Sequence, residues 1–288
     1  MFYKVILKIT LGTVQFGINY GISNTHGVPS DAELKAILSA AEEAGIQQLD
    51  TAQAYGNAEE RLGQFSEGRF QVITKFPAVA TREELENALS YSLSRLNSSS
   101  VYGYLAHNAA VLIEKPFLWE VLQKAKEEKT IAKIGFSLYH PEQLEQLLEL
   151  QCIPDLVQLP YSILDRKFED SLSILKKIGT EIHVRSVFLQ GLYFMDPDRL
   201  PEKLQPLRPA LMELQAICRG KNISVGDAAL NYAVSNPNID QIVMGVETAG
   251  QLQENIRMVS SWKRDAELFS RIEAIEIKDK SLLNPVNW

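Results

Sequence analysis

An acid and a phenol stand five positions apart in the segment DTAQAYGN, at Asp50 and Tyr55. The segment follows an apolar run that ends at Leu49, and it leads through a Gly-Asn turn into the start of a helix. An acid beside a tyrosine at the end of a strand is typical of a site that carries out chemistry, because such side chains add little to a hydrophobic core. Their partners must then come from the ends of neighbouring strands.

Polar side chains also follow the later apolar runs. In chain order they are Lys75, His107, Ser137, Gln158 and Arg185. The first two of these, Lys75 and His107, together with Asp50 and Tyr55, favour proton transfer to a carbonyl group. A phenol has a pKa of about 10, and we expect the nearby ammonium of Lys75 to lower it. Asp50 would keep Lys75 charged and oriented, and His107 would hydrogen-bond the substrate oxygen.

Each of these residues also has a purely structural interpretation. Asp50 and Lys75 would form an ion pair at the mouth of a barrel. His107 would be a hydrogen-bonded core histidine, and Tyr55 an ordinary loop aromatic. All of these interpretations must hold together for the site to be absent, so we expect a functional site.

The elements that position these residues alternate between strand and helix. Apolar runs predict strands at Ile9–Phe16, Ile46–Leu49, Gln71–Thr74, Val101–Ala106, Ile131–Phe136, Asp155–Val157, Glu181–Val184 and Gln241–Met244. Helical periodicity fills most of the intervals, which indicates parallel strands. Eight such units favour an α/β fold of the (β/α)8 TIM barrel type over an open doubly wound sheet. We expect one domain over residues 1–288, with a lead-in segment at 1–8 and a short tail at 276–288.

Composition narrows the class of protein. The net charge of −7 argues against nucleic acid as a partner, although it leaves room for a small anionic ligand. Two cysteines, without a CxxC motif, argue against a disulfide framework or a zinc site, and no metal is expected. The sequence shows neither a signal peptide nor an apolar stretch long enough for a membrane span. A cytoplasmic protein without a membrane partner is therefore expected.

The pattern of residues resembles the aldo-keto reductase superfamily, in its bacterial type with a short C-terminal loop. The resemblance rests on Asp50-Thr51-Ala52, Tyr55-Gly56 and Glu59, on Thr74-Lys75, and on Leu105-Ala106-His107-Asn108. It implies a catalytic tetrad of Asp50, Tyr55, Lys75 and His107. It also implies a nicotinamide cofactor bound without a Rossmann domain, which agrees with the lack of a GxGxxG motif. Relatives transfer a hydride from this cofactor to an aldehyde or ketone, and the tyrosine supplies the proton.

The same resemblance implies a set of cofactor contacts. They are Thr13, Ser137, Gln158, Arg185, Ser186, Phe188, Gln190, Gly191, Gly245, Glu247, Gln251, Glu254 and Asn255. Two positions depart from the family pattern. Leu138 replaces the asparagine that usually follows the serine, and Arg185 replaces the aromatic residue that stacks on the nicotinamide. Arg185 would stack on that ring, attract an anionic substrate, or pair with a carboxylate at the mouth.

The choice between NAD(H) and NADP(H) depends on the segment after the last strand. NADPH-preferring relatives place Lys or Arg where Gly245, Glu247 or Gln251 stand. A carboxylate at Glu247 would repel a 2′-phosphate and accept hydrogen bonds from a ribose diol, which favours NADH or dual use. Arg257 is an alternative source of positive charge.

We expect an NAD(P)H-dependent reductase of a small aldehyde or ketone, monomeric or weakly self-associated. A cofactor-binding regulatory protein with slow turnover, resembling the potassium-channel β-subunits, is the alternative. An isomerase with Lys75 as a Schiff base is a third interpretation. The short C-terminus implies an open substrate pocket, with Trp288 covering the outside of the barrel. Candidate pocket residues are Asn19, Tyr20, His26, Phe76, Asn108 and Tyr193.

Overall fold

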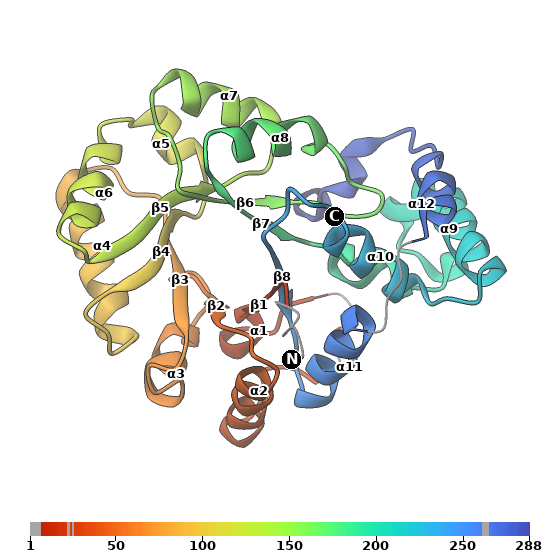
Figure 1. Cartoon of the computed structure of the whole chain (residues 1–288), viewed down its shortest axis with the longest axis horizontal. Coiled ribbons are helices and arrows are strands. Elements are labelled where there is room, and N and C mark those ends of the chain that lie inside the picture. Colours follow the sequence, from red (N-terminus) through yellow and green to blue (C-terminus); the bar gives the residue numbers. More distant parts are fainter. Residues whose placement is uncertain (1–6, 22–23, 25, 261–264) are drawn as a thin grey trace, which may run out of the picture.

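Eight parallel strands close into a barrel in the computed structural model, which describes residues 7–21, 24, 26–260 and 265–288. The strands follow one another around the barrel in chain order, and β1 pairs with β8 to close it. Helices surround the strands (Figure 1). The predicted (β/α)8 barrel is therefore confirmed. Because all strands are parallel, their carboxyl ends meet at one mouth.

The strands agree with the predicted runs to within a few residues, except the first. They are β1 (Ile9–Gly12), β2 (Gln48–Asp50), β3 (Gln71–Phe76), β4 (Val101–Ala106), β5 (Ile131–Ser137), β6 (Leu156–Pro160), β7 (Glu181–Arg185) and β8 (Gln241–Gly245). The prediction that the first strand continues to Phe16 is wrong. Thr13 turns the chain by bonding the Asp50 carbonyl through its amide and its hydroxyl, each at 2.9 Å, and a short helix follows.

Helices of different lengths connect the strands. They are α1 (Val14–Gly17), α2 (Asp31–Glu43), α3 (Ala58–Phe65), α4 (Arg82–Arg95), α5 (Ala110–Glu114), α6 (Leu118–Glu127), α7 (Pro141–Glu149), α8 (Glu169–Lys177), α9 (Arg208–Gly220), α10 (Val225–Val234), α11 (Ala249–Ser260) and α12 (Ala266–Glu273). Short 3₁₀ helices are η1 (Leu189–Phe194), η2 (Pro197–Arg199), η3 (Glu202–Leu207), η4 (Lys280–Leu283) and η5 (Pro285–Asn287). None of the helices in the described part is long and apolar enough to cross a bilayer.

Local sequence explains where the helices begin and which side they bury. Ser30 and Thr81 cap α2 and α4, since each hydroxyl accepts a hydrogen bond from the amide three residues later. In α2 the side chains of Leu34, Ile37 and Leu38 recur at helical spacing and are fully buried. Buried apolar side chains recur in the same way in α6 and α8, which pack against β5 and β7.

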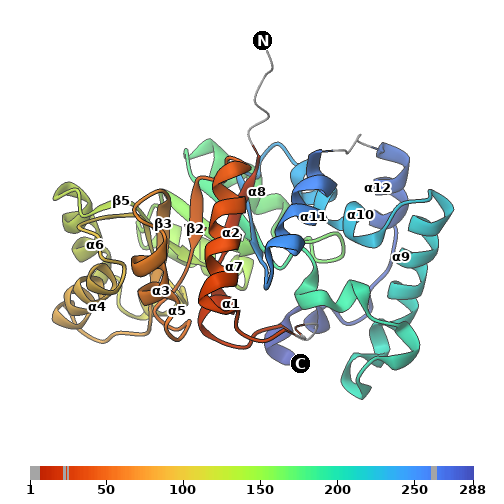
Figure 2. The same ribbon diagram turned by 90° about the horizontal axis from the view of Figure 1, so that it is seen from below.

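The first and last long helices of the ring lie side by side. Figures 1 and 2 show α2 next to α11. The carboxylate of Glu33 on α2 accepts a hydrogen bond of 2.7 Å from the amide of Ala249, the first residue of α11. A negative charge at that position also suits the N-terminus of α11. The ring of helices thus closes where β1 meets β8.

The structure describes the C-terminal tail and only part of the N-terminal segment. Residues 1–6 of the expected lead-in segment lie outside the described residues. The tail forms η4 and η5, and the indole of Trp288 donates a hydrogen bond of 2.7 Å to the Leu282 carbonyl. Trp288 also packs against the hydrophobic core.

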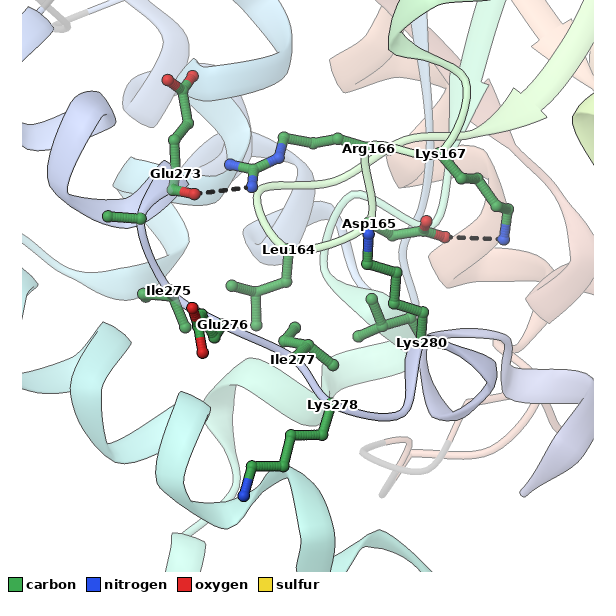
Figure 3. Close-up of a pocket in the computed structure, with 12 residues that line it drawn as sticks. Leu164, Asp165, Arg166, Lys167, Glu273, Ile275, Glu276, Ile277, Lys278 and Lys280 are labelled. Carbon is green, nitrogen blue, oxygen red and sulfur yellow. Dashed lines mark hydrogen bonds and ion pairs between the residues drawn. The ribbon is translucent and has the colours of Figure 1, made fainter.

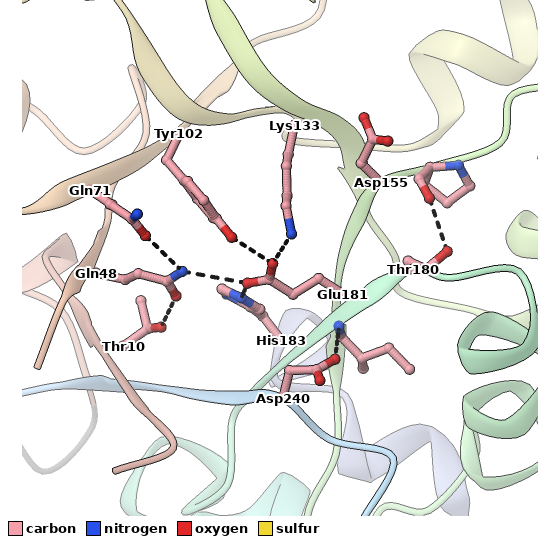
Figure 4. Close-up of polar contacts among 12 residues, drawn as sticks. Thr10, Gln48, Gln71, Tyr102, Lys133, Asp155, Thr180, Glu181, His183 and Asp240 are labelled. Atoms are coloured by element: carbon pink, nitrogen blue, oxygen red, sulfur yellow. Dashed lines mark hydrogen bonds and ion pairs between the residues drawn. The ribbon is translucent and has the colours of Figure 1, made fainter. Parts of the chain in front are cut away.

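A polar network occupies the end of the barrel opposite the mouth (Figure 4). Glu181, the first residue of β7, accepts hydrogen bonds from Tyr102 at 2.7 Å, from Lys133, from Gln48 at 3.4 Å and from His183 at 2.6 Å. Burial acts to raise the pKa of Glu181, but the hydrogen bonds from these partners outweigh it and hold that pKa below its usual range. The network therefore ties β2, β4, β5 and β7 together through one carboxylate.

We predict that Glu181→Gln lowers the free energy of unfolding by about 2 kcal/mol at pH 7, because hydrogen bonds to a charged group are lost. The folded pKa of Glu181 lies below the unfolded value, so its contribution is present above about pH 4.3 and is lost as the pH falls further. Urea unfolding between pH 3 and 8 measures this. Glu145→Gln, an exposed change on α7, is the control. Equal stability of the two variants at pH 7 would contradict the prediction.

Candidate active site

A buried ion pair forms the base of the site. The ammonium of Lys75 lies 2.7 Å from Oδ1 of Asp50 and donates a second hydrogen bond of 2.9 Å to the Thr51 carbonyl. Both side chains are almost fully buried, with exposed fractions of 1% and 3%. The other carboxylate oxygen of Asp50 accepts a hydrogen bond of 2.7 Å from the amide of Gln158. The pair therefore joins the carboxyl ends of β2, β3 and β6.

Tyr55 and His107 lie directly above this pair. The ammonium of Lys75 is 5.2 Å from the centre of the Tyr55 ring. The rings of Tyr55 and His107 meet edge to face, with centres 5.6 Å apart and planes at 86°. The structure thus brings together the four residues that the sequence predicts as a tetrad, although they span 57 positions from Asp50 to His107.

The electrostatics of Tyr55 differ from the sequence-based expectation. Burial raises the pKa of Tyr55, and the carboxylate of Asp50 raises it further. The prediction that Lys75 lowers this pKa is wrong, because Asp50 neutralises the ammonium from 2.7 Å while the phenol is removed from water. Arg185 is the cation that acts to lower the pKa of Tyr55. The phenol therefore keeps its proton at neutral pH.

Burial also decides the charge of the two nitrogen bases. It lowers the pKa of His107 to about 4, and the ammonium of Lys75 adds to the effect. His107 is therefore a neutral imidazole at pH 7. Burial lowers the pKa of Lys75 as well, but Asp50 opposes this through its charge and its hydrogen bond.

The loop that carries Tyr55 is held from two sides. Gly17 of α1 and Gly56 face each other so closely that a Cβ on Gly17 would lie 1.8 Å from the Tyr55 carbonyl oxygen. Gly56 also has a left-handed φ of 58°, which favours glycine. From the other side, α4 contributes Arg95, which donates to the Gly56 carbonyl, and Ser92, which accepts from the amide of Gln53 at 2.8 Å.

A buried carboxylate links this support to the strand that carries Lys75. Glu59 of α3 has no exposed surface and accepts hydrogen bonds from Thr74 at 2.6 Å and from Ser92 at 2.8 Å. A nitrogen of Arg95 lies 3.8 Å from its second oxygen. Sequence reasoning missed Arg95, because it sits at the end of a helix 40 positions beyond Tyr55.

Ser137 and Gln158 lie side by side where β5 and β6 end, paired in the strand register. Both side chains are buried, with exposed fractions of 1% and 2%. In the described part of the chain, the hydroxyl of Ser137 and the side-chain carbonyl of Gln158 have no hydrogen-bond partner. Together they offer the donor and the acceptor that a carboxamide requires.

Arg185 ends β7 and turns toward the loop after β5. Its guanidinium donates a hydrogen bond of 3.0 Å to the Leu138 carbonyl and lies 4.4 Å from the centre of the Tyr139 ring. Within the described residues, no carboxylate lies within 4.0 Å of Arg185, so the alternative in which it pairs with an acid at the mouth is not found. The contact with Tyr139 could not be predicted from the sequence, because it joins two residues that are 46 positions apart.

The loop after Arg185 has an unusual backbone. Ser186, Leu189 and Gln190 have left-handed φ values of 63°, 47° and 53°, and Gly191 follows with 92°. Non-glycine residues in this region cost about 1 kcal/mol each, so the surrounding fold must enforce the conformation. The side-chain amide of Gln190 donates a hydrogen bond of 2.8 Å to the Tyr20 hydroxyl, which connects the loop to the segment after β1.

The predicted adenosine-binding residues are only partly brought together. The carboxylate of Glu247 accepts a hydrogen bond of 3.1 Å from Gln251 and lies 3.4 Å from Nδ1 of His26. Glu254 instead faces solvent on α11, where it pairs with Arg257. Asn255 is half-buried on the same helix, and Gly245 packs against the side chain of Gln15.

Several other predicted residues do not line the mouth. Thr13 is fully buried, and its hydroxyl donates a hydrogen bond to the backbone carbonyl of Asp50 on β2. Phe76 is fully buried against Tyr104. Tyr193 is 1% exposed, and its hydroxyl shares a hydrogen bond of 2.7 Å with Ser162. By contrast Tyr20 is 39% exposed. Thr13 was expected from the family resemblance as a cofactor contact, and Phe76 and Tyr193 were candidate pocket residues; the sequence does not show the direction in which these side chains point.

A cavity of about 530 Å³ lies apart from the tetrad (Figure 3). The loop after β6, residues 164–167, and the segment after α12, residues 273–278, form its walls. Arg166 donates a hydrogen bond of 3.0 Å to the Glu273 carbonyl, and Lys167 pairs with Asp165 at 3.0 Å. Its lining contains basic, acidic and apolar side chains, and none of the four tetrad residues belongs to it.

Known proteins share this fold and sequence pattern. The family model described as Aldo/keto reductase family matches residues 8–277. An uncharacterized oxidoreductase, YqkF, from Bacillus subtilis is 22% identical over 78% of this chain and 82% of its own length. The NADH-specific methylglyoxal reductase of Escherichia coli is 24% identical over 77% of this chain and 81% of its own. The holo form of the aldo-keto reductase AKR11C1 from Bacillus halodurans superposes with a TM-score of 0.77 at 21% identity, covering 93% of this chain and 91% of that structure.

We predict that Arg95→Met lowers the turnover number about tenfold, because small displacements of a reacting group are costly and this change frees the Gly56 carbonyl beside Tyr55. Steady-state kinetics at saturating substrate, with thermal melting of each variant, measure the effect. Arg82→Met is the matched control, since Arg82 lies on the same helix but pairs with exposed Glu120. Turnover equal to that of the control would contradict a role of Arg95 in positioning Tyr55.

Proposed function

Because this chain belongs to the aldo/keto reductase family, we propose that it reduces a small aldehyde or ketone with a nicotinamide cofactor and that Tyr55 donates the proton. Membership of the family supports NAD(P)H-dependent carbonyl reduction as the general activity. The convergence of Asp50, Tyr55, Lys75 and His107 at the barrel mouth carries the specific proposal.

The raised pKa of Tyr55 suits a proton donor in the reductive direction. When bound, the reduced nicotinamide supplies the hydride to the carbonyl carbon. The carbonyl oxygen then becomes strongly basic, and the phenol of Tyr55 gives up its proton to it. The neutral imidazole of His107 donates a hydrogen bond to the same oxygen and orients it. Lys75, held by Asp50, lies against the Tyr55 ring, and the charge of Arg185 favours the phenolate that remains.

The polar groups around the tetrad fit the cofactor. Ser137 and Gln158 would hold the carboxamide of the nicotinamide with their free hydroxyl and carbonyl groups. The left-handed backbone from Ser186 to Gly191 would follow the pyrophosphate, since such turns can direct backbone amides toward an anion. Phe188 is half-buried on this loop and would flank the cofactor.

Glu247 supports a preference for NADH. Its carboxylate is 9% exposed and is held by Gln251, so it cannot swing away from an approaching phosphate without losing that hydrogen bond. The similarity to an NADH-specific methylglyoxal reductase agrees with this choice. Arg257, the alternative source of positive charge, pairs with Glu254.

A Schiff base at Lys75 finds no support in the geometry. The ammonium is 1% exposed and bonded to both Asp50 and the Thr51 carbonyl. A substrate carbonyl would have to displace both acceptors to reach the nitrogen.

We predict that Tyr55→Phe lowers the rate of carbonyl reduction by about 10²- to 10⁴-fold, the usual contribution of a positioned acid, while cofactor affinity stays within a few-fold of the wild type. Stopped-flow absorbance of the nicotinamide and fluorescence titration measure the two quantities. Tyr91→Phe, on the exposed face of α4, is the control. Retained turnover would remove Tyr55 as the proton donor. Tight cofactor binding with negligible wild-type turnover would instead favour the regulatory alternative.

We predict that Glu247→Arg raises the ratio of kcat/KM for NADPH over NADH about tenfold, because a hydrogen-bonded charge pair with the 2′-phosphate replaces a repulsion. Glu247→Gln should shift the ratio in the same direction by a smaller factor, since it removes only the repulsion. The measurement is a pair of cofactor titrations at fixed substrate. An unchanged ratio in both variants would show that Glu247 does not face the ribose.

A further inference from the structure

The side chain of Arg185 lies at the mouth of the barrel and extends from one strand toward the loop of another. It starts at the end of β7 and contacts Leu138 and Tyr139, which follow β5. Because β6 lies between β5 and β7, this path carries the guanidinium past the end of β6. The backbone amide of Leu138 donates a hydrogen bond of 2.8 Å to the backbone carbonyl of Gln158 on β6. The charge of Arg185 is therefore held at the mouth, close to the strand ends that carry Ser137 and Gln158, and not on the outside of the barrel.

Arg185 is a cation whose charge is not balanced by a neighbouring acid. Lys75 is neutralised by Asp50 at 2.7 Å, and His107 is uncharged at pH 7. No carboxylate in the described part of the chain comes within 4.0 Å of Arg185. A half-buried charge without a counterion is costly, so its position suggests that the counterion arrives with a ligand.

The guanidinium is fixed in place but retains free donors. Tyr139 supports one face of its plane, and one nitrogen bonds the Leu138 carbonyl. A guanidinium has five N–H groups in a planar fork, and this fork matches the two oxygens of a carboxylate. A lysine at this position would lack both the planar support and the paired donors.

We propose that Arg185 binds the carboxylate of the substrate, which makes a small 2-oxo acid the preferred substrate class. This inference rests on the proposed carbonyl reduction. In a 2-oxo acid the carboxylate is bonded directly to the carbonyl carbon, so an anion site beside the proton donor holds both groups at once. The charge of Arg185 already acts on Tyr55 and His107, which places it within electrostatic reach of both.

The reaction then balances as follows. The keto carbon accepts a hydride from the reduced nicotinamide, and the electron pair of the C=O double bond moves to oxygen. That oxygen takes the proton of Tyr55, which water restores. The products are a 2-hydroxy acid and the oxidised cofactor. The carboxylate stays ionised on Arg185 throughout.

Pairs of acids and their neutral amides test the proposal: glyoxylate and glyoxylamide, pyruvate and pyruvamide, phenylglyoxylate and phenylglyoxylamide. The wild type should show a higher kcat/KM for each acid. Arg185→Met should lower the acid-to-amide ratio of kcat/KM by about 10- to 100-fold, the effect expected for losing hydrogen bonds to a charged group. Arg185→Lys should retain part of the preference, since it keeps the charge.

Arg166→Met is the matched control, because it removes the same charge from the next loop at the mouth, where Arg166 bonds only the Glu273 carbonyl among the described residues. Its acid-to-amide ratio should equal that of the wild type. An unchanged ratio in Arg185→Met would overturn the proposal. An equal loss for acids and amides, together with weaker cofactor binding, would also overturn it, because Arg185 would then serve the cofactor alone.

A binding measurement separates this proposal from the proposed function. Oxamate is a carboxylate that resists reduction, and oxamide is its neutral counterpart. Calorimetry with the protein saturated in oxidised cofactor should show that Arg185→Met raises the Kd of oxamate at least tenfold, whereas Arg166→Met leaves it unchanged. Oxamate that binds no better than oxamide to the wild type would sink the inference. Oxamate binding to Arg185 without turnover of any carbonyl would instead refute the reductase function alone.

Discussion

The buried ion pair between Lys75 and Asp50 is the interaction on which the site depends. Two charges with exposed fractions of 1% and 3% are costly to remove from water, and their attraction repays this cost only when every remaining donor and acceptor is satisfied. The Thr51 carbonyl accepts a second hydrogen bond from Lys75, and the side-chain amide of Gln158 bonds the other oxygen of Asp50. Such a pair is weak evidence for stability, but it fixes three strand ends relative to one another. It also offsets the charge of Lys75, so that burial is the main cause of the raised pKa of Tyr55 and of the lowered pKa of His107.

Support for the reacting groups comes from outside the barrel as much as from within it. The strands carry Asp50 and Lys75, whereas Tyr55 lies on a loop that contacts both α1 and α4. Glu59 bonds Ser92 of α4 and Thr74 of β3, so the supports of Tyr55 and of Lys75 are connected. The helices of the outer ring therefore contribute to the geometry of the site, in addition to covering the sheet.

The two ends of the barrel differ in whether a charged side chain has a partner of opposite charge. At the end opposite the mouth, Glu181 accepts hydrogen bonds from side chains of several strands and pairs with Lys133. At the mouth Arg185 is held by an aromatic ring and one carbonyl, without an acid nearby in the described part. The first arrangement stabilises the fold. The second leaves a cation available, which is what the recognition of an anionic carbonyl compound requires.

The sequence by itself determined the barrel and the ring of polar residues at its mouth. Short apolar strands alternating with helices permit few topologies, and parallel strands bring the residues that follow them to one edge. The sequence alone therefore predicted that one end of the barrel carries Asp50, Lys75, Ser137, Gln158 and Arg185.

Tertiary structure alone decided the direction of each side chain and its surroundings. It ended β1 at Gly12, placed Tyr139 under Arg185, brought Arg95 to the Tyr55 loop and reversed the expected shift in the pKa of Tyr55. These features depend on packing between segments that are distant in the chain, and on how far each group is removed from water. Neither quantity follows from local spacing, because the same residue types at the same positions can face the mouth or the core.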